Sequence, residues 1–417
     1  MRYIDLFAGA GGFSEGFKRA GGEPVAHVEV DTAACFTLKT RLSYYELLEK
    51  NNLDVYVSYL KGEISREKLY SFIPSPILNS VINLPIGDEN NQEIFKKIDE
   101  LNCGKRVDFI IGGPPCQAYS LVGRARAANG MKGDPRNYLY IYYGRFLKRY
   151  EPKLFVFENV IGLLSAENGR HFKNIKRYYR RVGYVVEPFI VNAHDFGVLQ
   201  NRKRVIIVGW RKELGLSIDQ LSGDGKAQHK VTSIFDDLPK LNAGEGRDKY
   251  LHYAHEQVSD YLRSAKIRNG IGILTQHIAR PHSEQDKKIY KIAVERWKTC
   301  QERLDYNDLP DELKTHENRH SFLDRFKVVA DDMPYSQTVV AHIAKDGHYY
   351  IHPDIEQNRS ISVREAARLQ SFPDDYYFEG VKEGQNRTCA FKQIGNAVPP
   401  LMIETIAKKL LQMVSGK

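Results

Sequence analysis

A single cysteine on a rigid turn constrains this chain more than any other feature. Residues 112–120 read Gly-Gly-Pro-Pro-Cys-Gln-Ala-Tyr-Ser and follow the apolar run 107–111. Two glycines and two prolines end that strand, so Cys116 is predicted at a strand's carboxyl end, where open α/β sheets place their chemistry. Nearby positive charge would make an exposed thiol there nucleophilic. A structural cysteine in a turn is the alternative.

The composition is that of a soluble globular protein with excess positive charge. The chain has 417 residues, 42% of them hydrophobic and 27% charged, and a net charge of +9. That length suits two or three domains, and the charge favours an acidic polymer as partner, although many basic proteins bind no nucleic acid. Residues 1–7 already form a strand pattern, and no apolar run approaches the ~20 residues of a membrane span. We therefore expect an intracellular protein without a membrane anchor.

A glycine-rich turn near the amino terminus predicts a nucleotide-like cofactor. The strand pattern 3–7 runs into Ala8-Gly9-Ala10-Gly11-Gly12 and then a predicted helix. Glycines at such a turn let a ligand approach the backbone beside a helix amino terminus. A second strand, 24–30, contains Glu29, about twenty residues after Gly9, where an acid can bind ribose hydroxyls. The pattern alone also suits NAD, but no partner for hydride transfer is apparent.

Two further strands end in side chains that can act in a reaction. The apolar strand 154–157 ends at Glu158, and the strand 204–209 begins at Arg204 after Gln200-Asn201-Arg202-Lys203. Parallel strands that end in reactive side chains converge on one pocket. Taken alone, a glutamate in this place is more often a helix cap or a surface acid, and the arginines would form a basic surface.

These motifs together resemble those of the DNA cytosine-5 methyltransferases. The resemblance covers most of residues 1–40, 107–210 and 334–417, in one order. It rests on Pro-Cys-Gln at 115–117, the first glycine motif at 5–12, Glu-Asn-Val at 158–160, Gln-x-Arg-x-Arg at 200–204, Thr338-Val339 and Gln393 to Pro400. It implies an α/β fold: a Rossmann-like S-adenosylmethionine-dependent methyltransferase sheet with a smaller, irregular target recognition domain.

The resemblance also implies residue roles. The thiolate of Cys116 adds to C6 of a flipped-out cytosine, Glu158 neutralises N3, Arg204 holds O2 and Arg202 supports the site. For S-adenosylmethionine it implies that Phe7 stacks on the adenine and Glu29 binds the ribose, with further contacts from Ala8, Gly9, Gly11, Gly12, Pro115 and Asn396. For DNA it implies phosphate contacts from Ser120, Arg124 and Arg136, with Thr338 close to the position that the flipped base vacates.

The predicted domains are a catalytic and cofactor-binding domain at 1–210, a target recognition domain at 211–384 and a returning segment at 385–417. Residues 41–106 depart from the family pattern, and we expect two or three surface helices between Arg41 and Ile73. The contact to the adenine edge stays unassigned, with Asn83 and Asp88 as candidates.

Two helices are predicted near the end of the chain. Ser362-Val363-Arg364-Glu365 is a capping-box pattern that opens a helix before Pro373. Pro400 begins a final helix whose apolar stripe predicts packing on the first domain, beside the Gly9 turn.

A zinc-protease pattern, His316-Glu317-x-x-His320, is weighed and rejected. Its flanks form no long apolar helix, and no third ligand is evident. The five cysteines form no Cys-x-x-Cys pair either, so we expect no metal.

We therefore expect an enzyme that transfers methyl from S-adenosylmethionine to C5 of cytosine in a specific double-stranded DNA sequence. It would be the modification half of a restriction-modification system, a monomer on DNA in the bacterial cytoplasm at the nucleoid, with a cognate restriction endonuclease acting separately. One alternative is a transfer-RNA cytosine-5 methyltransferase, whose Cys-Phe-Thr motif lies in the recognition domain; here Cys35-Phe36-Thr37 lies among the cofactor segments. The other is a catalytically inactive, methyltransferase-like DNA-binding protein.

Overall fold

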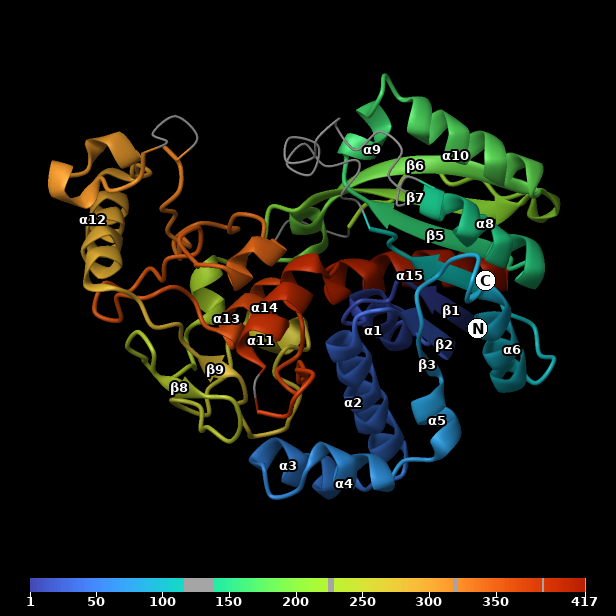
Figure 1. The fold of residues 1–417 in the computed structure, drawn as a ribbon, viewed down its shortest axis with the longest axis horizontal. Helices are drawn as coiled ribbons and strands as arrows, with labels where there is room; N and C mark the ends of the chain where they lie inside the picture. The colour runs from blue at the N-terminus through green and yellow to red at the C-terminus, as the bar shows by residue number, and fades with distance from the viewer. Residues whose placement is uncertain (116–137, 224–228, 318–321, 385, 417) are drawn as a thin grey trace.

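The centre of the protein is a seven-stranded, mostly parallel sheet (Figure 1). The computed structural model describes residues 1–115, 138–223, 229–317, 322–384 and 386–416. The strand order is β3-β2-β1-β4-β5-β7-β6, with β7 antiparallel to both β5 and β6. The strands are β1 (Arg2–Leu6), β2 (Glu23–Glu29), β3 (Val81–Asn83), β4 (Phe109–Gly112), β5 (Leu154–Asn159), β6 (Tyr184–Asn192) and β7 (Lys203–Arg211). The predicted α/β fold is confirmed.

Helices cover both faces of the sheet, because alternate strand residues are apolar on each side. One face packs on α6 (Asn91–Asn102), α8 (Leu139–Tyr150) and α10 (Arg170–Arg181), through side chains such as Phe146 and Tyr179. The other face packs on α1 (Gly12–Arg19) and α15 (Pro400–Ser415), through Phe17 and Ile403 among others. This arrangement leaves the carboxyl ends of β1, β2, β4 and β5 at one edge.

The final helix packs against the first one, as its apolar stripe predicts. A Cβ on Gly16 of α1 would lie 2.6 Å from Cβ of Ile403, so the two helices meet at backbone distance. A Cβ on Gly12 would lie 2.3 Å from the Val398 carbonyl oxygen. The last part of the chain therefore supports the turn that begins at Gly9.

The helices between Arg41 and Ile73 are present, but the prediction that they lie only on the surface is wrong. They are α2 (Thr32–Glu49), α3 (Leu53–Lys61) and α4 (Arg66–Ser71), followed by α5 (Ser75–Asn79). Tyr56 and Tyr59 are fully buried and pack in a cluster with Tyr377. The segment is thus a structural support for the part of the chain near residue 377.

The region from Lys212 to Val381, called here the irregular region, has short elements and a core of its own. Its elements include β8 (Gly246–Arg247), α11 (Asp260–Ser264), β9 (His277–Ile278), α12 (Glu284–Cys300) and α13 (Val363–Leu369), and α14 (Arg387–Asn396) packs on that core. The predicted capping box is confirmed, with Ser362 and Glu365 bonding reciprocally at the start of α13. The limits of the three predicted domains stay a prediction.

Buried ion pairs hold this irregular region together. Arg368 is fully buried and contacts Asp237 at 2.6 Å and Asp374 at 2.5 Å. Arg359 is also buried and pairs with Glu365 at 2.7 Å. Such pairs are stable only when every charge is matched, because an unpartnered buried charge is costly. No helix in the described part of the chain combines the length and apolar character that crossing a membrane requires.

Candidate active site

Glu158 and the described residues that lead to Cys116 lie at the ends of neighbouring strands, β5 and β4, at the carboxyl edge of the sheet. β4 and β5 pair in parallel, with Gly112 opposite Phe157. The chain leaves β4 through Gly113, and a Cβ built there would lie 3.0 Å from Oε2 of Glu158. Cys116, Ser120, Arg124 and Arg136 lie outside the described residues. The turn that leads to Cys116 therefore passes directly beside Glu158.

Asn159 fixes this turn, a role that the sequence analysis did not assign. Its buried amide donates from Nδ2 to the carbonyl oxygen of Pro114 at 3.2 Å, and its Oδ1 accepts from the backbone N–H of Val160 at 3.0 Å. One side chain thus connects the end of β5 to the residues just before Cys116. Its position next to Glu158 in the Glu-Asn-Val motif was the available signal.

Glu158 and Arg204 form a close ion pair. Nε of Arg204 lies 2.8 Å from Oε1 of Glu158, and the two side chains are 13% and 14% exposed. Arg204 also donates from one terminal nitrogen to the carbonyl oxygen of Lys203 at 2.8 Å. Because β7 runs antiparallel beside β5, a residue at the start of β7 reaches the end of β5. The pair can present a carboxyl group and a guanidinium to one small planar ligand.

Arg202 connects the start of β7 to two distant segments of the chain. Its fully buried guanidinium donates to the carbonyl oxygens of Val339 at 2.6 Å and Ala397 at 2.8 Å. These bonds join the start of β7 to the irregular region and to the segment after α14. Arg202 therefore holds three segments together, and the expectation that it supports the catalytic site stays a prediction.

The cofactor turn begins at a strained residue. Phe7, directly after β1, has a φ of 57°, which non-glycine residues rarely adopt, and such strain is typical of functional sites. Its side chain is partly buried against the sheet core. Gly9 has a φ of 54°, and nothing lies within 4 Å of a Cβ built there. The backbone at Gly9 is thus open to a ligand.

Glu29 holds this turn and keeps capacity for a ligand. Its Oε2 accepts from the N–H of Gly9 at 2.7 Å, while Oε1 accepts from those of Val30 at 2.9 Å and Asp31 at 2.8 Å. A carboxylate oxygen can accept two hydrogen bonds, so Oε2 has room for one hydroxyl donor. Burial raises the pKa of Glu29, against the effect of these N–H donors.

The residues around the turn fit S-adenosylmethionine. Gly9 leaves the backbone open, Glu29 offers an acceptor for a ribose hydroxyl, and Phe7 supplies an aromatic ring. These residues lie near the start of α1, where the N-cap residue is Gly11 and no side chain caps the helix. The free N–H groups of a helix amino terminus suit a carboxylate such as that of a methionine moiety. When bound, S-adenosylmethionine supplies an activated methyl group.

Gly11 and Gly12 are required for packing. A Cβ on Gly11 would lie 2.7 Å from Cδ2 of Leu38 and 2.9 Å from the hydroxyl of Tyr376. Gly12 meets Val398, as described above. Ala8 is buried and donates its N–H to the carbonyl oxygen of Val28 at 3.2 Å. Of these glycines, Gly9 is therefore the one whose backbone has open space for a ligand.

Of the two candidates for the adenine edge, Asn83 is the better placed. It lies at the end of β3, paired with Glu29, and donates from Nδ2 to the carbonyl oxygens of Glu29 and Val30, each at 3.0 Å. Asp88 instead contacts Tyr142 and Arg145 of α8, at 2.7 and 2.5 Å. Asn83 therefore shares the strand ends of the cofactor residues.

Three predicted site residues remain: Thr338, Pro115 and Asn396. Thr338 donates its hydroxyl to the carbonyl oxygen of Asn201 at 2.6 Å, which ties the irregular region to β7. Pro115 and Asn396 are exposed. The proposed ligand contacts of these three residues stay predictions.

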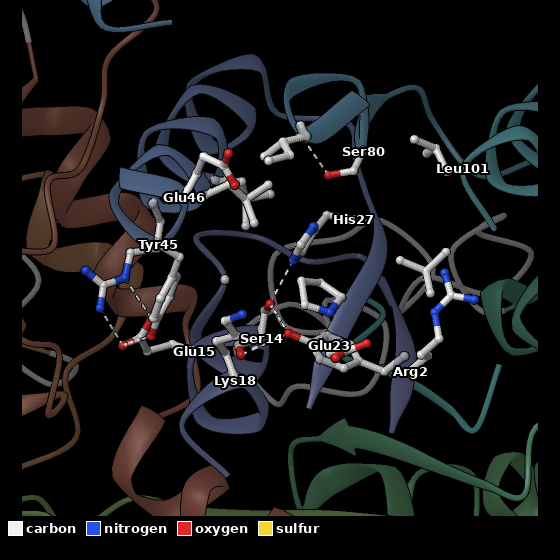
Figure 2. A pocket seen from close by; sticks show the side chains of 18 of the residues that line it. Arg2, Ser14, Glu15, Lys18, Glu23, His27, Tyr45, Glu46, Ser80 and Leu101 are labelled. Carbon is white, nitrogen blue, oxygen red and sulfur yellow. Dashed lines mark hydrogen bonds and ion pairs between the residues drawn. The ribbon is translucent and has the colours of Figure 1, made fainter. Parts of the chain in front are cut away.

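A cavity of about 380 Å³ lies on the side of the sheet covered by α1 and α2 (Figure 2). Ser14 and His27 line it, with Oγ of Ser14 2.7 Å from Nε2 of His27. Burial lowers the pKa of His27 to about 4, so its ring is neutral near pH 7. The lining includes Gly11, one of the predicted cofactor contacts, but not Phe7, Gly9 or Glu29.

The zinc-protease pattern has no helical context. His316 stacks on Phe322 with ring centroids 4.0 Å apart, outside any helix, and His320 lies outside the described residues. Among the residues that are described, no group of three His, Cys, Asp or Glu side chains could hold a metal ion.

Comparison with known proteins identifies the family. The C-5 cytosine-specific DNA methylase family matches residues 1–64 and 77–412. The chain is 41% identical to the type II methyltransferase M.Bpa9945I of Bacillus paralicheniformis, over the whole of both chains. It is 31% identical to M1.HphI of Haemophilus parahaemolyticus, covering 99% of this chain and 87% of the relative. The chain therefore belongs to the C-5 cytosine-specific DNA methylases, which transfer methyl from S-adenosylmethionine to cytosine C5 in DNA.

The fold is shared with solved structures of low sequence identity. A candidate prophage-encoded DNA modification methyltransferase of E. coli superposes with a TM-score of 0.64 at 22% identity, covering 100% of this chain and 99% of the other. The methyltransferase EhMeth of Entamoeba histolytica gives a TM-score of 0.55 at 13% identity, covering 100% and 98%.

Proposed function

We propose that this chain is the modification methyltransferase of a restriction-modification system and that Cys116, Glu158 and Arg204 carry its chemistry. The observation that carries the proposal is the Glu158–Arg204 pair beside the Gly113 turn that leads to Cys116. The two bacterial relatives described above are named as type II methyltransferases, which supports the modification role.

C5 of cytosine, the carbon that receives the methyl group, is a poor nucleophile and must first be activated. The cytosine leaves the duplex stack, because C5 and C6 are inaccessible inside it. The sulfur of Cys116 forms a bond to C6, and the electrons of the C5–C6 double bond become available at C5 while charge builds on N3 and O2. C5 would then take the methyl group from the sulfonium of S-adenosylmethionine, whose S–CH3 bond breaks with its electron pair left on sulfur, which leaves the neutral thioether S-adenosylhomocysteine. A base removes the C5 proton, the C5–C6 double bond re-forms and the C6–S bond breaks, which returns the thiolate.

Glu158 and Arg204 stabilise the ring while it carries this charge. A carboxyl group at N3 supplies or shares a proton, and a guanidinium at O2 stabilises negative charge there. Their contact of 2.8 Å keeps both groups oriented before the base arrives. Asn159 acts through another group, because it positions the Pro114 turn and so the approach of Cys116.

Specificity is proposed to reside in residues 211–355, which begin at the end of β7 and continue through most of the irregular region. Phosphate contacts from Ser120, Arg124 and Arg136 carry no base sequence, so bases must be read by side chains presented to the grooves. We further propose a monomer that acts on bacterial nucleoid DNA, beside a separate restriction endonuclease.

The position of Cys35-Phe36-Thr37 argues against the alternative of a transfer-RNA cytosine-5 methyltransferase. Cys35 is buried in α2 and donates to the carbonyl oxygen of Glu29 at 3.4 Å. Burial raises the pKa of the Cys35 thiol to about 12, which suits a structural cysteine.

Two measurements test the proposal. Bisulfite sequencing of DNA from a host that expresses the chain should show complete methylation at one short sequence. DNA carrying 5-fluorocytosine at that site should trap the wild type covalently and leave Cys116→Ser untrapped, because the fluorine blocks the final elimination. Equal trapping of Cys116→Ser would contradict the nucleophile assignment, and an unmethylated genome would favour the catalytically inactive alternative.

A further inference from the structure

The outer face of α10 is a row of cations. Ile175 and Tyr179 are buried against the sheet on the inner face of this helix. At 100° per residue, the basic side chains fall within an arc of roughly 140° on the opposite face. They are Arg170, Lys173, Lys176, Arg177, Arg180 and Arg181. All of them except Lys176, which is partly buried, are exposed.

Most of this charge is not neutralised by neighbouring acids. Lys176 contacts Glu187 at 3.0 Å, and Arg170 lies 3.7 Å from Glu167. Among the residues that the structure describes, no carboxylate pairs with Lys173, Arg177 or Arg180 within 4 Å, nor with Arg181. Like charges three and four residues apart repel one another along a helix, so the isolated row is unfavourable.

The row also forms a hollow. Five side chains line a depression of about 440 Å³: Lys173, Lys176, Arg177, Arg180 and Arg181. A surface lined by cations alone is complementary to a polyanion, and binding there would relieve the repulsion within the helix.

The place of α10 connects this surface to the reaction. The chain passes from β5, which carries Glu158, through α9 (Gly162–Ser165) into α10, which then runs along the sheet to the start of β6 (Figure 1). One end of the basic row therefore begins near the catalytic edge, and the other leads away from it. The row is roughly 16 Å long, which matches about five phosphates of one DNA strand.

We propose that this face of α10 binds the phosphates of duplex DNA outside the recognition sequence. The inference rests on the DNA substrate of the family and not on the roles proposed for Cys116, Glu158 or Arg204. An amphipathic membrane helix would need its apolar face free, and here Ile175 and Tyr179 occupy the core. The surface offers charge alone, so the contact is independent of base sequence and releases counterions.

The test removes three unpaired cations and compares short with long DNA. The variant is Lys173→Gln, Arg177→Gln and Arg180→Gln together. The matched control is Lys96→Gln, Lys105→Gln and Arg106→Gln, which removes the same charge from exposed positions on α6 and before β4. Binding is measured on duplexes of about 15 and about 60 base pairs that carry the same methylation site, over a range of salt.

We expect the wild type and the control to bind the long duplex more tightly than the short one. The α10 variant should lose that advantage, with the slope of log affinity against log salt on long DNA smaller by about 2 to 3. On the short duplex it should methylate as the wild type does. A hydroxyl-radical footprint should keep the target site and lose protection of phosphates beside it.

The proposal is overturned if the α10 variant keeps the long-duplex advantage and its salt slope, or if the control loses them equally. A variant that fails on the short duplex as well would place α10 in the target site itself and contradict binding outside it. Failure of the proposed catalytic roles is distinguishable, because it would appear as absent methylation with all footprints intact.

Discussion

The sheet and the irregular region differ in how buried ion pairs contribute to their stability. The sheet region buries aromatic and branched side chains on both faces, and its reactive groups lie where strands end. The irregular region has an apolar core as well, with matched buried charges such as Arg368 with Asp237 and Asp374. Apolar packing tolerates small changes, whereas a buried charge that loses its partner is strongly destabilising. The first arrangement suits a fixed site, and the second allows surface loops to vary around a charged core.

The largest expected effect is the loss of stability when the buried ion pairs of Arg368 are removed. Arg368→Met should lower the free energy of unfolding by about 3 to 5 kcal/mol, because Asp237 and Asp374 lose the buried partner that they share. Arg268 still contacts Asp237, and Arg364 still lies 3.9 Å from Asp374. Phe155→Ala, in β5, should cost a similar ~3 to 5 kcal/mol through a cavity. Denaturant unfolding at several pH values separates the two.

The cost of Arg368→Met should shrink as the pH falls towards 4, because the two carboxylates that have lost Arg368 take up protons, while the cost of Phe155→Ala should not. Adding Asp237→Asn and Asp374→Asn should restore part of the loss in Arg368→Met. Equal pH dependence of the two single variants would contradict the contrast between the regions.

The second expected effect concerns the chemistry at the end of β5. Glu158→Gln should reduce the methylation rate by about a hundredfold or more, since a positioned acid is lost. Cofactor affinity should change little. Glu151→Gln, which alters an exposed acid before the same strand, is the matched control and should methylate normally. Near wild-type turnover of Glu158→Gln at saturating DNA would remove this residue from the mechanism.

The two regions should also differ in acid. In the irregular region, burial lowers the pKa of His277 and His282 to about 4 and of His352 to about 3. In the sheet, burial lowers the pKa of His27 to about 4. An unfolded histidine binds its proton near pH 6.5, so the stability from keeping these rings neutral is present above that pH and is lost as the pH falls towards 4.

A carboxyl group adds to this loss below pH 4.5. Although burial acts against it, the Arg359 guanidinium holds the pKa of Glu365 well below its usual range. Its contribution is present above the unfolded pKa and is lost as the pH falls further. Although burial acts against them, Arg41 and Arg19 likewise lower the pKa of Glu15 in α1 to about 2, so the carboxyl contribution is present in both regions. The irregular region should unfold at a higher pH than the sheet because it holds more of the described buried histidines.

One tryptophan reports on each region. Trp297 lies in α12 and Trp210 in β7. During acid titration, the fluorescence of Trp210→Phe, which retains Trp297, should change at a higher pH than that of Trp297→Phe. Coincident transitions would show that the two regions unfold as one unit.

The smallest expected effect distinguishes two candidates for the cofactor. Asn83→Ala should raise the KM for S-adenosylmethionine several-fold, as expected when a neutral hydrogen-bonding group is lost. Asp88→Ala should leave it unchanged, because Asp88 contacts α8. A larger effect of Asp88→Ala would reverse the assignment.

The sequence predicted the sheet region well because its signals are local. The strand before Gly113, Glu158 at the end of β5 and the helix after Pro400 each follow from apolar runs and breakers near them in the chain. The capping box at Ser362 is local as well. What could not be predicted depends on distant partners, such as Arg202 with Val339 and Ala397, or Tyr59 beside Tyr377. From the sequence alone, charged and aromatic residues at those positions are expected on the surface, because the partners that bury them are distant in the chain.

Exchanging residues 211–355 for those of a relative with a different target tests most directly whether catalysis and sequence recognition lie in separate regions of the chain. Bisulfite sequencing of host DNA then maps the methylated sites of the hybrid. We predict methylation at the relative's sequence, with the catalytic edge of the sheet unchanged. Methylation at the original sequence would contradict the account and place recognition in residues 41–106 or in the segment that follows Cys116.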